Sequence, residues 1–446
     1  MQEKTIDETQ QGNTLVLEHK SENKKKLFIE SYGCSMNFSD SEIVASILAE
    51  QGYNTTSNLE DADLVLVNTC SIRDKAEQTV RKRLEKYNAV KREQNPKMKV
   101  GVLGCMAERL KEQFLDEEKI VDMVVGPDAY KDLPNLLAEV EAGNDAVNVI
   151  LSKEETYGDI APVRLNTNGI NALVSITRGC DNMCTFCVVP FTRGRERSRD
   201  PQSILEEVND LAAKGYKEVT LLGQNVDSYL WYGGGLKKDF KKATEMQKAT
   251  ATDFAKLLSM VAEAQPTMRV RFSTTNPQDM TEDVFHVMAK YPNICNHIHL
   301  PFQSGSDRML KEMNRQHTAA EYLALVTKMW EILPDCSISQ DIIVGFPSAT
   351  EEDDVPEATK KRRLTEIVDA QRSHSAFRTQ QFLGKTTKVL VEKESKKNPN
   401  QWSGRNEQSI VVVFPKENYK PGDFVNVKIN DCTSATLIGN AVVSSE

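Results

Sequence analysis

Residues 172–199 read "ALVSITRGCDNMCTFCVVPFTRGRERSR". A strand-like apolar run leads directly into Cys180, Cys184 and Cys187, which are spaced C-x3-C-x2-C and are called here the barrel trio. A structural zinc site uses four ligands, usually two cysteine pairs or cysteines with histidines. Three closely spaced thiols instead favour an iron–sulfur cluster, which is normally held by four. One iron of such a cluster would stay open for a substrate or a cofactor.

The region after the barrel trio alternates strand-like runs with helix-like stretches. The runs are "KEVTLLGQN", "RVRFSTTNP", "NHIHLPFQSG" and "SISQDIIVGFP", and the stretches cover roughly residues 202–214, 253–264, 281–290 and 306–331. At least five βα units predict a full or partial TIM-type barrel, whose site lies at the carboxyl ends of its strands. Polar side chains at those predicted ends include Gln224, Asn225, Ser273, Gln303 and Asp341.

Three further cysteines lie upstream, each just past the end of a strand-like run. "KLFIESYGC" ends at Cys34, "DLVLVNTC" at Cys70 and "MKVGVLGC" at Cys105, with helix-like stretches between them. Alternating strands and helices form parallel sheets, and ligands bind outside the carboxyl ends of the strands. We therefore expect these three cysteines, called here the sheet trio, to meet at one sheet edge and to hold a second cluster. The alternative is three unrelated cysteines buried as small apolar side chains.

The chain as a whole is predicted to be α/β with three folded parts. Residues 1–25 are interpreted as a disordered tail, 26–145 as a parallel α/β sheet domain and 146–375 as the partial (β/α) barrel. Residues 376–446 alternate apolar and polar residues between Gly, Pro and Asn, which predicts a small all-β barrel.

Composition places the chain among soluble globular proteins, with 39% hydrophobic and 27% charged residues among 446. No apolar run approaches the 18 residues of a membrane span, and the N-terminus lacks the apolar core of a signal peptide. We therefore expect a cytoplasmic protein without a membrane partner, whose nine cysteines stay reduced. Cys295, Cys336 and Cys432 are interpreted as structural.

A net charge of −9 argues weakly against a nucleic-acid partner, but phosphate binding needs only a local basic face. Such a face is offered by the arginines that follow the barrel trio, namely Arg193, Arg195, Arg197 and Arg199. The alternative for these arginines is ion pairing that holds the loop.

The C-x3-C-x2-C motif after the first strand of a βα barrel resembles the radical S-adenosylmethionine (SAM) superfamily. "YGCSMNFSDSE", "NTCSIRDKAEQTVRKRL" and "GVLGCMAERL" resemble the three cysteine motifs of the methylthiotransferases within it. With "LLGQNVDSY", "HLPFQSGSDRMLKEMNR" and "DIIVGFP", the resemblance runs almost from residue 26 to 347. The C-terminal β segment resembles a TRAM domain, an RNA-binding barrel. "YGCSMN" resembles the branch of the family that modifies N6-isopentenyladenosine in tRNA.

The resemblance implies two [4Fe-4S] clusters, each bound by one trio, so that all six cysteines are catalytic. The cluster of the barrel trio would bind SAM and cleave it to a 5′-deoxyadenosyl radical. The auxiliary cluster of the sheet trio would supply sulfur. The implied reaction is methylthiolation of carbon 2 of N6-isopentenyladenosine at tRNA position 37, with one SAM as methyl donor and one as radical source.

The strand-end positions Gln224, Asn225, Ser273, Gln303 and Asp341 are the expected SAM contacts. The expected RNA contacts are Arg193, Arg195, Arg197, Arg199, Lys385, Lys388 and Arg405. Expected partners are the tRNA anticodon stem-loop, an electron donor such as flavodoxin or ferredoxin, and an Fe–S carrier that repairs the auxiliary cluster. We expect a monomer.

The sequence departs from the family pattern in two places. Thr275-Asn276-Pro277 stands where the family usually has Ser-His-Pro. After "DIIVGFPSATEED" the family continues with a helix and a sixth strand, whereas this chain passes directly to "DVPEATKKRRL". We expect a segment to be missing near residues 353–355 and the barrel to be open beside its site.

Three alternatives stay open at this point. One is a methylthiotransferase that acts on threonylcarbamoyladenosine in tRNA or on ribosomal protein S12. Another is a non-catalytic Fe–S protein that binds RNA. The third is a zinc protein.

Overall fold

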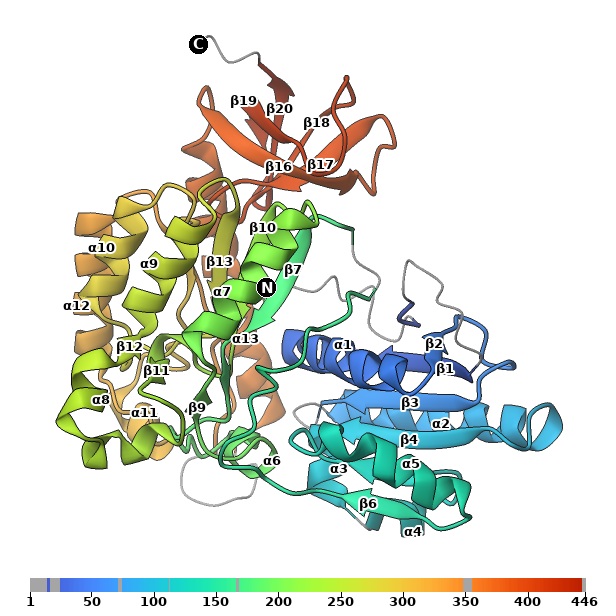
Figure 1. The fold of residues 1–446 in the computed structure, drawn as a ribbon. Helices are drawn as coiled ribbons and strands as arrows, with labels where there is room; N and C mark the ends of the chain where they lie inside the picture. The colour runs from blue at the N-terminus through green and yellow to red at the C-terminus, as the bar shows by residue number, and fades with distance from the viewer. Residues whose placement is uncertain are drawn as a thin grey trace.

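The computed structural model describes residues 14–16, 25–70, 74–111, 113–165, 168–347 and 355–442. Most of the predicted tail, and part of the place where a segment was expected to be missing, lie outside the described residues. Figure 1 shows an N-terminal sheet domain, a barrel-like α/β part and a small β barrel at the C-terminal end.

The N-terminal part is a six-stranded parallel sheet in the order β2-β1-β3-β4-β5-β6. Its strands are β1 (Lys25–Ser31), β2 (Tyr53–Thr55), β3 (Leu64–Thr69), β4 (Lys99–Gly104), β5 (Met123–Val125) and β6 (Ala146–Asn148). All six residues of β3 are buried, as expected for a parallel strand covered on both faces. The short strands β2 and β6 at the edges were not predicted.

Helices cover both faces of this sheet. They are α1 (Ser35–Glu50), α2 (Asp74–Glu93), α3 (Cys105–Leu110), α4 (Gln113–Glu117) and α5 (Leu133–Glu141). Apolar side chains of α1 and α5 pack in one core, and those of α2, α3 and α4 in another. The sheet therefore lies between two helical layers, as the alternating pattern predicted.

The middle of the chain forms five parallel βα units. The strands that build it are β7 (Asn171–Ser175), β10 (Glu218–Leu222), β13 (Arg269–Ser273), β14 (His297–His299) and β15 (Ser337–Ser339). β7, β10 and β13 form one sheet, β14 pairs with β15, and a parallel bridge between Val270 and Ile294 joins the two groups. This arrangement confirms the partial barrel.

The other elements of this part include its helices and two pairs of short strands. The helices are α6 (Val189–Thr192), α7 (Pro201–Ala213), α8 (Glu245–Thr250), α9 (Phe254–Ala264), α10 (Glu282–Lys290), α11 (Asp307–Glu312) and α12 (Ala319–Ile332). The short strands are β8 (Thr177–Arg178) with β9 (Arg197–Ser198), and β11 (Leu230–Trp231) with β12 (Thr252–Asp253). The single stretch expected at 306–331 is two helices, α11 and α12.

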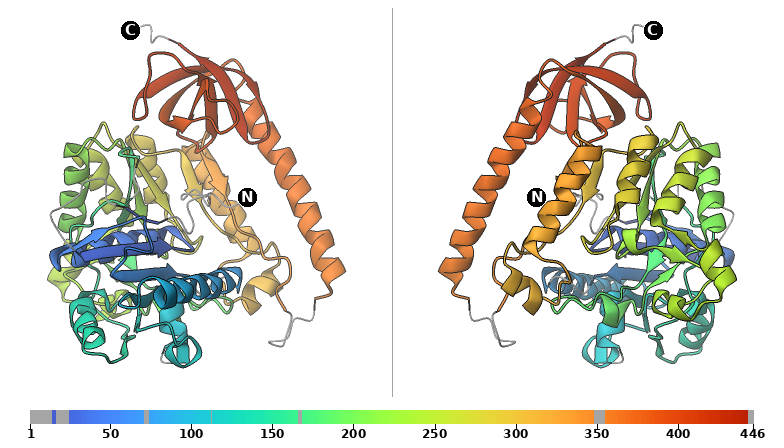
Figure 2. Two further views of the ribbon diagram at one scale, coloured as in Figure 1. Left: turned by 90° about the vertical axis from the view of Figure 1, so that its right-hand side faces the viewer. Right: turned by 90° about the vertical axis from the view of Figure 1, so that its left-hand side faces the viewer.

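One long helix, α13 (Glu357–Gln380), leads to the C-terminal barrel, and Thr379 is its one buried residue. Figure 2 shows α13 standing apart from the rest of the α/β part. The C-terminal strands β16 (Thr386–Glu394), β17 (Gln401–Arg405), β18 (Val411–Pro415), β20 (Thr436–Ala441) and β19 (Phe424–Cys432) close into a barrel in that order. The predicted small β barrel is thus confirmed.

The two outer parts lie at opposite ends of the central strands (Figure 1). The C-terminal barrel lies at their amino ends, where Arg269 and Arg271 of β13 donate to the carbonyls of Arg405 and Asn406, both over 2.8 Å. The N-terminal domain lies toward their carboxyl ends, where the predicted site is.

Candidate active site

The sheet trio lies at one edge of the N-terminal sheet, as predicted. Cys34 is the residue before α1, Cys70 follows β3, and Cys105 begins α3. Their strands β1, β3 and β4 are adjacent in the sheet. Gly33 has φ +114, and a Cβ on it would lie 2.3 Å from the Cβ of Cys70. Glycine at this position therefore lets the Cys34 and Cys70 loops approach each other closely.

The thiols of the sheet trio influence one another electrostatically. A hydrogen bond with Cys70, together with the charge of Arg193, lowers the pKa of the Cys34 thiol to about 6. Burial raises the pKa of Cys105. The lowered pKa favours the thiolate of Cys34, the form that binds metals.

The barrel trio lies on a loop that folds back on itself. Gly179 has φ +76, and a Cβ on it would lie 2.2 Å from the carbonyl oxygen of Arg195. The backbone N–H of Cys180 donates to Gly194 O over 3.2 Å, and β8 pairs with β9. The arginines follow the cysteines closely because they form the returning side of the same loop.

Burial raises the pKa of Cys180 to about 12 and also raises that of Cys187. The groups that act on the Cys187 thiol include Cys184, Arg315 and, from the N-terminal domain, Cys105. Cys105 of the sheet trio therefore lies near Cys187 of the barrel trio, at the junction of the two domains.

Most of the arginines of this loop are buried, so the expected RNA contacts need correction. Arg193, Arg197 and Arg199 are 2%, 1% and 6% exposed. Arg193 pairs with Asp40, Arg197 with Asp128 and Arg199 with Glu207. Each of these three guanidiniums therefore pairs with a carboxylate of the protein, which supports the alternative that they hold the loop by ion pairing. The side chain of Arg195 is 46% exposed, and its partner Asp181 lies 3.4 Å away.

Two arginines contact the thiols directly. Arg193 Nε donates to Cys105 Sγ over 3.2 Å, and Arg315 Nη1 donates to Cys184 Sγ over 3.5 Å. Each also has one buried nitrogen without an acceptor among the described residues, Nη1 in Arg193 and Nε in Arg315.

Buried polar groups are normally hydrogen-bonded. An iron–sulfur cluster carries sulfides that accept hydrogen bonds, so both trios fit such a group. Within the described ranges, no three His, Cys, Asp or Glu side chains form a site for a single metal ion, whereas in a four-iron cluster each cysteine binds a different iron.

The five expected SAM contacts lie at the carboxyl ends of the central strands. Gln224 Oε1 accepts from the N–H of Gly179 over 2.6 Å, next to Cys180. Asn225 Nδ2 donates to Asp279 over 2.7 Å, and its buried Oδ1 has no hydrogen-bond partner within the described part. Ser273 ends β13, and the N–H of Gln303 donates to Asp341 O over 3.1 Å.

Several residues of this site escaped sequence analysis. Arg315 also donates to Asn276 Oδ1 over 3.0 Å, so the asparagine in place of the usual histidine is an acceptor for the arginine that contacts Cys184. Lys237 pairs with Glu196 and Asp279. These residues lie far apart in the chain and in loops without periodicity. The "MNR" of the quoted family motif was the available signal for Arg315.

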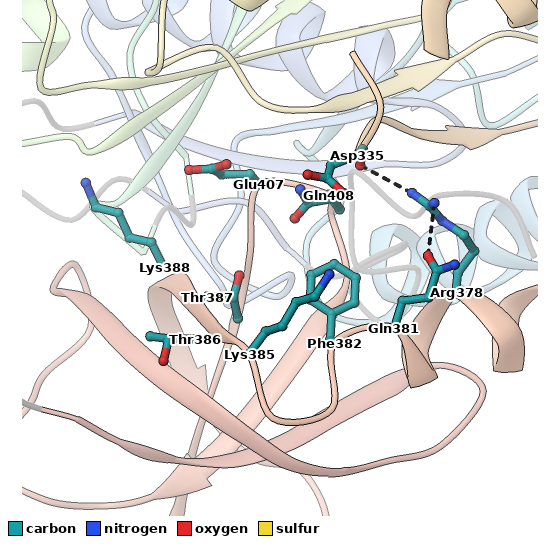
Figure 3. A pocket seen from close by; sticks show the side chains of 10 residues that line it. All are labelled: Asp335, Arg378, Gln381, Phe382, Lys385, Thr386, Thr387, Lys388, Glu407 and Gln408. Carbon is teal, nitrogen blue, oxygen red and sulfur yellow. Dashed lines mark hydrogen bonds between the residues drawn. The ribbon is translucent and has the colours of Figure 1, made fainter. Parts of the chain in front are cut away.

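The basic residues expected in the C-terminal barrel lie far from both trios. Lys385 and Lys388 line a cavity of about 260 Å³ between this barrel, the end of α13 and Asp335 (Figure 3). Lys388 also lies 4.7 Å from the ring centroid of Phe424, and Arg405 lies 3.7 Å from Glu392. Whether these three residues bind RNA stays a prediction.

Among the helices that the structure describes, none is both long and apolar enough to cross a membrane. All nine cysteines are free thiols. Cys295 and Cys336 are buried and Cys432 is half-buried, in line with structural roles.

Three sequence families match the chain. They are the uncharacterized protein family UPF0004 over residues 26–126, the radical SAM superfamily over residues 174–356 and the TRAM domain over residues 380–442. The matches follow the three folded parts of the chain.

Curated relatives match over the whole length. Proteins of Christiangramia forsetii (69% identical, covering 100% of this chain and 99% of the relative) and Flavobacterium johnsoniae (70%, covering 99% and 98%) are both named tRNA-2-methylthio-N(6)-dimethylallyladenosine synthase. So is a protein of Bacteroides thetaiotaomicron (48%, covering 95% and 97%). The alignment with the first spans 479 positions against the 446 residues of this chain, so this chain has no residue at 33 of them.

Among solved structures, the fold is similar to that of the radical SAM methyltransferase TsrM from Kitasatospora setae. The TM-score is 0.50 at 13% identity, and the match covers 78% of this chain and 71% of that one. This likeness concerns the fold alone.

Proposed function

The chain belongs to the family of tRNA-2-methylthio-N(6)-dimethylallyladenosine synthases, and we propose that it converts N6-isopentenyladenosine at tRNA position 37 to its 2-methylthio derivative. It is a radical SAM enzyme of tRNA modification, with SAM and two [4Fe-4S] clusters as its cofactors. The observation that carries the proposal is that Arg193, from the loop of the barrel trio, donates to Cys105 of the sheet trio, so that trios from two different domains are brought together.

The reaction must break a C–H bond of adenine, and acids or bases do not remove this hydrogen at neutral pH. When bound, the clusters and SAM supply the carbon radical that takes this hydrogen and the methylthio group that replaces it. The barrel trio would hold one cluster and the sheet trio the other. The loop of residues 178–199 brings them together, because Arg178 and Arg193 both reach Asp40 of the N-terminal domain over 2.8 Å.

The proposed SAM contacts are the polar residues at the carboxyl ends of the central strands. Gln224 anchors the backbone beside Cys180, which holds the cluster loop against the end of β10. The Oδ1 of Asn225, which has no hydrogen-bond partner among the described residues, is available to a donor on the ligand. Ser273, Gln303 and Asp341 complete the proposed set.

The RNA is proposed to enter beside the cluster loop. Arg195 is the exposed arginine of that loop, and the neighbouring Phe186 and Phe191 are 40% and 66% exposed. Single-stranded RNA loops are bound by phosphate contacts and by stacking of unpaired bases on aromatic rings. Lys385, Lys388 and Arg405 are kept as proposed contacts to the more distant stem, which would have to reach the other end of the central strands.

The finer partners belong to the same proposal. An electron must come from outside the chain, from a donor such as flavodoxin or ferredoxin, and an Fe–S carrier must rebuild the auxiliary cluster. We place the enzyme in the cytoplasm, where tRNA is available and free thiols stay reduced, and we expect it to act as a monomer.

Anaerobic turnover with three substrates tests the proposal. The reconstituted chain should contain about eight irons, as two four-iron clusters require, and should form the 2-methylthio product on isopentenylated tRNA. Product on threonylcarbamoylated tRNA or on ribosomal protein S12 instead would favour those alternatives. Iron binding without 5′-deoxyadenosine formation would favour a non-catalytic RNA-binding protein.

A further inference from the structure

Arg193 comes from the cluster loop of the central part, but its side chain lies among the sheet trio of the N-terminal domain. It is 2% exposed. Its Nε donates to Cys105 Sγ over 3.2 Å, and its Nη2 donates to Asn37 Oδ1 over 3.0 Å. Asn37 Oδ1 also accepts from the Cys34 thiol over 3.5 Å. The Arg193 guanidinium thus contacts the Cys105 thiol directly and the Cys34 thiol through Asn37.

The bonding of Arg193 is incomplete. Its Nη1 is buried and has no hydrogen-bond partner in the part of the chain that the structure describes. Its counter-ion, Asp40, is shared with Arg178, since each arginine lies 2.8 Å from a different oxygen of that carboxylate. A buried donor without an acceptor is unfavourable, and more so when the group is charged. The site therefore holds a buried guanidinium with an unused donor next to three thiols.

We propose that Arg193 is a positioning residue for the auxiliary cluster, to which its Nη1 donates a hydrogen bond and whose reduced form its charge stabilises. Hydrogen bonds to the sulfurs and the net charge nearby are what sets the reduction potential of an iron–sulfur cluster. The inference rests on the proposed function, because it requires a cluster at the sheet trio. It adds that a residue of the SAM-binding part controls the cluster of the other domain.

A competing explanation is that Arg193 only joins the two domains. Arg197 supplies the matched comparison, since it lies on the same loop, is 1% exposed and pairs with Asp128. Its other hydrogen bonds go to the backbone carbonyls of Glu155, Arg193 and Arg195, and not to a thiol. Replacing Arg197 therefore removes an equally buried charge from the loop without removing a contact to a cysteine.

The experiment uses the full chain with Cys180, Cys184 and Cys187 replaced by Ala, so that the signal comes from the sheet trio alone. Into this parent we would introduce Arg193→Gln, Arg193→Lys or Arg197→Gln and reconstitute each anaerobically. The readouts are iron and sulfide content, the midpoint potential from a redox titration followed by electron paramagnetic resonance, and the melting temperature of the cluster-free chain.

We expect Arg193→Gln to lower the midpoint potential or to lose the cluster, while its cluster-free chain melts like that of Arg197→Gln. The midpoint potential of Arg193→Lys should lie between those of the parent and Arg193→Gln. Lysine keeps the positive charge but lacks the planar guanidinium with its several N–H donors. Arg197→Gln should give a clearly smaller shift. An unchanged potential in Arg193→Gln, or equal shifts in Arg193→Gln and Arg197→Gln, would overturn the inference alone. A parent without any cluster at the sheet trio would instead contradict the proposed function as well.

Discussion

Arg178 Nη1 lies 2.8 Å from Asp40 Oδ1, and these two residues, 138 positions apart in the chain, are 1% and 0% exposed. Asp40 belongs to α1 of the N-terminal domain, and Arg178 ends the strand that leads into the barrel trio. The other oxygen of Asp40 pairs with Arg193. Asp40 thus pairs with two arginines of the cluster loop and helps to fix that loop against the other domain.

Asp40→Asn is expected to destabilise the protein strongly, because it removes the buried carboxylate that pairs with both Arg178 and Arg193. Breaking a buried pair by removing one partner costs about 3–5 kcal/mol. Urea unfolding of the cluster-free chain measures the change. Asp210→Asn is the control, since the Asp210–Lys214 pair is largely exposed and contributes at most about 0.5 kcal/mol. Equal effects of the two substitutions would contradict the role given to Asp40.

Glu108 is expected to make stability depend on pH. It is 2% exposed, its Oε2 has no hydrogen-bond partner in the described ranges, and burial raises its pKa to about 7 from an ordinary 4.5. Between these two values the folded chain binds more protons than the unfolded chain, so stability falls as pH rises from 4.5 to 7. The free energy of unfolding can fall by at most about 1.4 kcal/mol per pH unit from this one group.

Glu108→Gln should remove this loss and should make the protein more stable than the parent at pH 8. Urea unfolding at several pH values from 4.5 to 8 measures it, with the exposed Glu139→Gln as the matched control. The same pH slope in Glu108→Gln and in the parent would contradict the assignment.

Arg195→Gln is expected to weaken tRNA binding without affecting the fold. A phosphate contact to single-stranded RNA contributes about 0.7 to the slope of log affinity against log salt, so the variant should lose about that much. Binding titrations at four salt concentrations measure the slope. Lys248→Gln, in the outlying helix α8, should leave it unchanged. If Arg195→Gln and the parent have the same slope, Arg195 does not bind a phosphate.

The flank of the barrel next to β15 is expected to bind the segment that the family pattern has after "DIIVGFPSATEED". The alignment with the Christiangramia forsetii protein spans 33 more positions than this chain has residues, and we expect these positions to fall there. Leu323 and Trp330, seven positions apart on α12, are 64% and 47% exposed. Burial of side chains of this size stabilises by about 1.5–3 kcal/mol each. The loss of a barrel strand itself stays a prediction.

The test is to insert, between residues 347 and 355 of this chain, the corresponding segment of the Christiangramia forsetii protein. With Trp231 and Trp402 replaced by Phe, the emission of Trp330 should shift to shorter wavelength and the melting temperature should rise. A Gly-Ser insert of equal length should do neither. Unchanged emission with the relative's segment would contradict the expectation.

The sheet and the sheet trio could be predicted because both depend on local patterns. Each strand is a short apolar run followed by a cysteine, and the parallel topology then brings Cys34, Cys70 and Cys105 to one edge. The burial of the arginines was harder to predict, because a run of charged residues has the same sequence whether its side chains face solvent or a buried carboxylate. Asp40, which decides this for Arg193, lies 153 residues away within a helix. It belongs to the quoted motif "YGCSMNFSDSE", but nothing in those letters pairs it with an arginine.

The division of labour between the two trios is the central claim, and anaerobic turnover of Cys34→Ala with isopentenylated tRNA tests it most directly. The variant keeps the barrel trio, so it should still cleave SAM to 5′-deoxyadenosine. It should form no 2-methylthio product, because the sheet trio is incomplete. Cys184→Ala, the matched variant in the other trio, should lose SAM cleavage as well. Normal product from Cys34→Ala would contradict the role of the sheet trio as the source of sulfur.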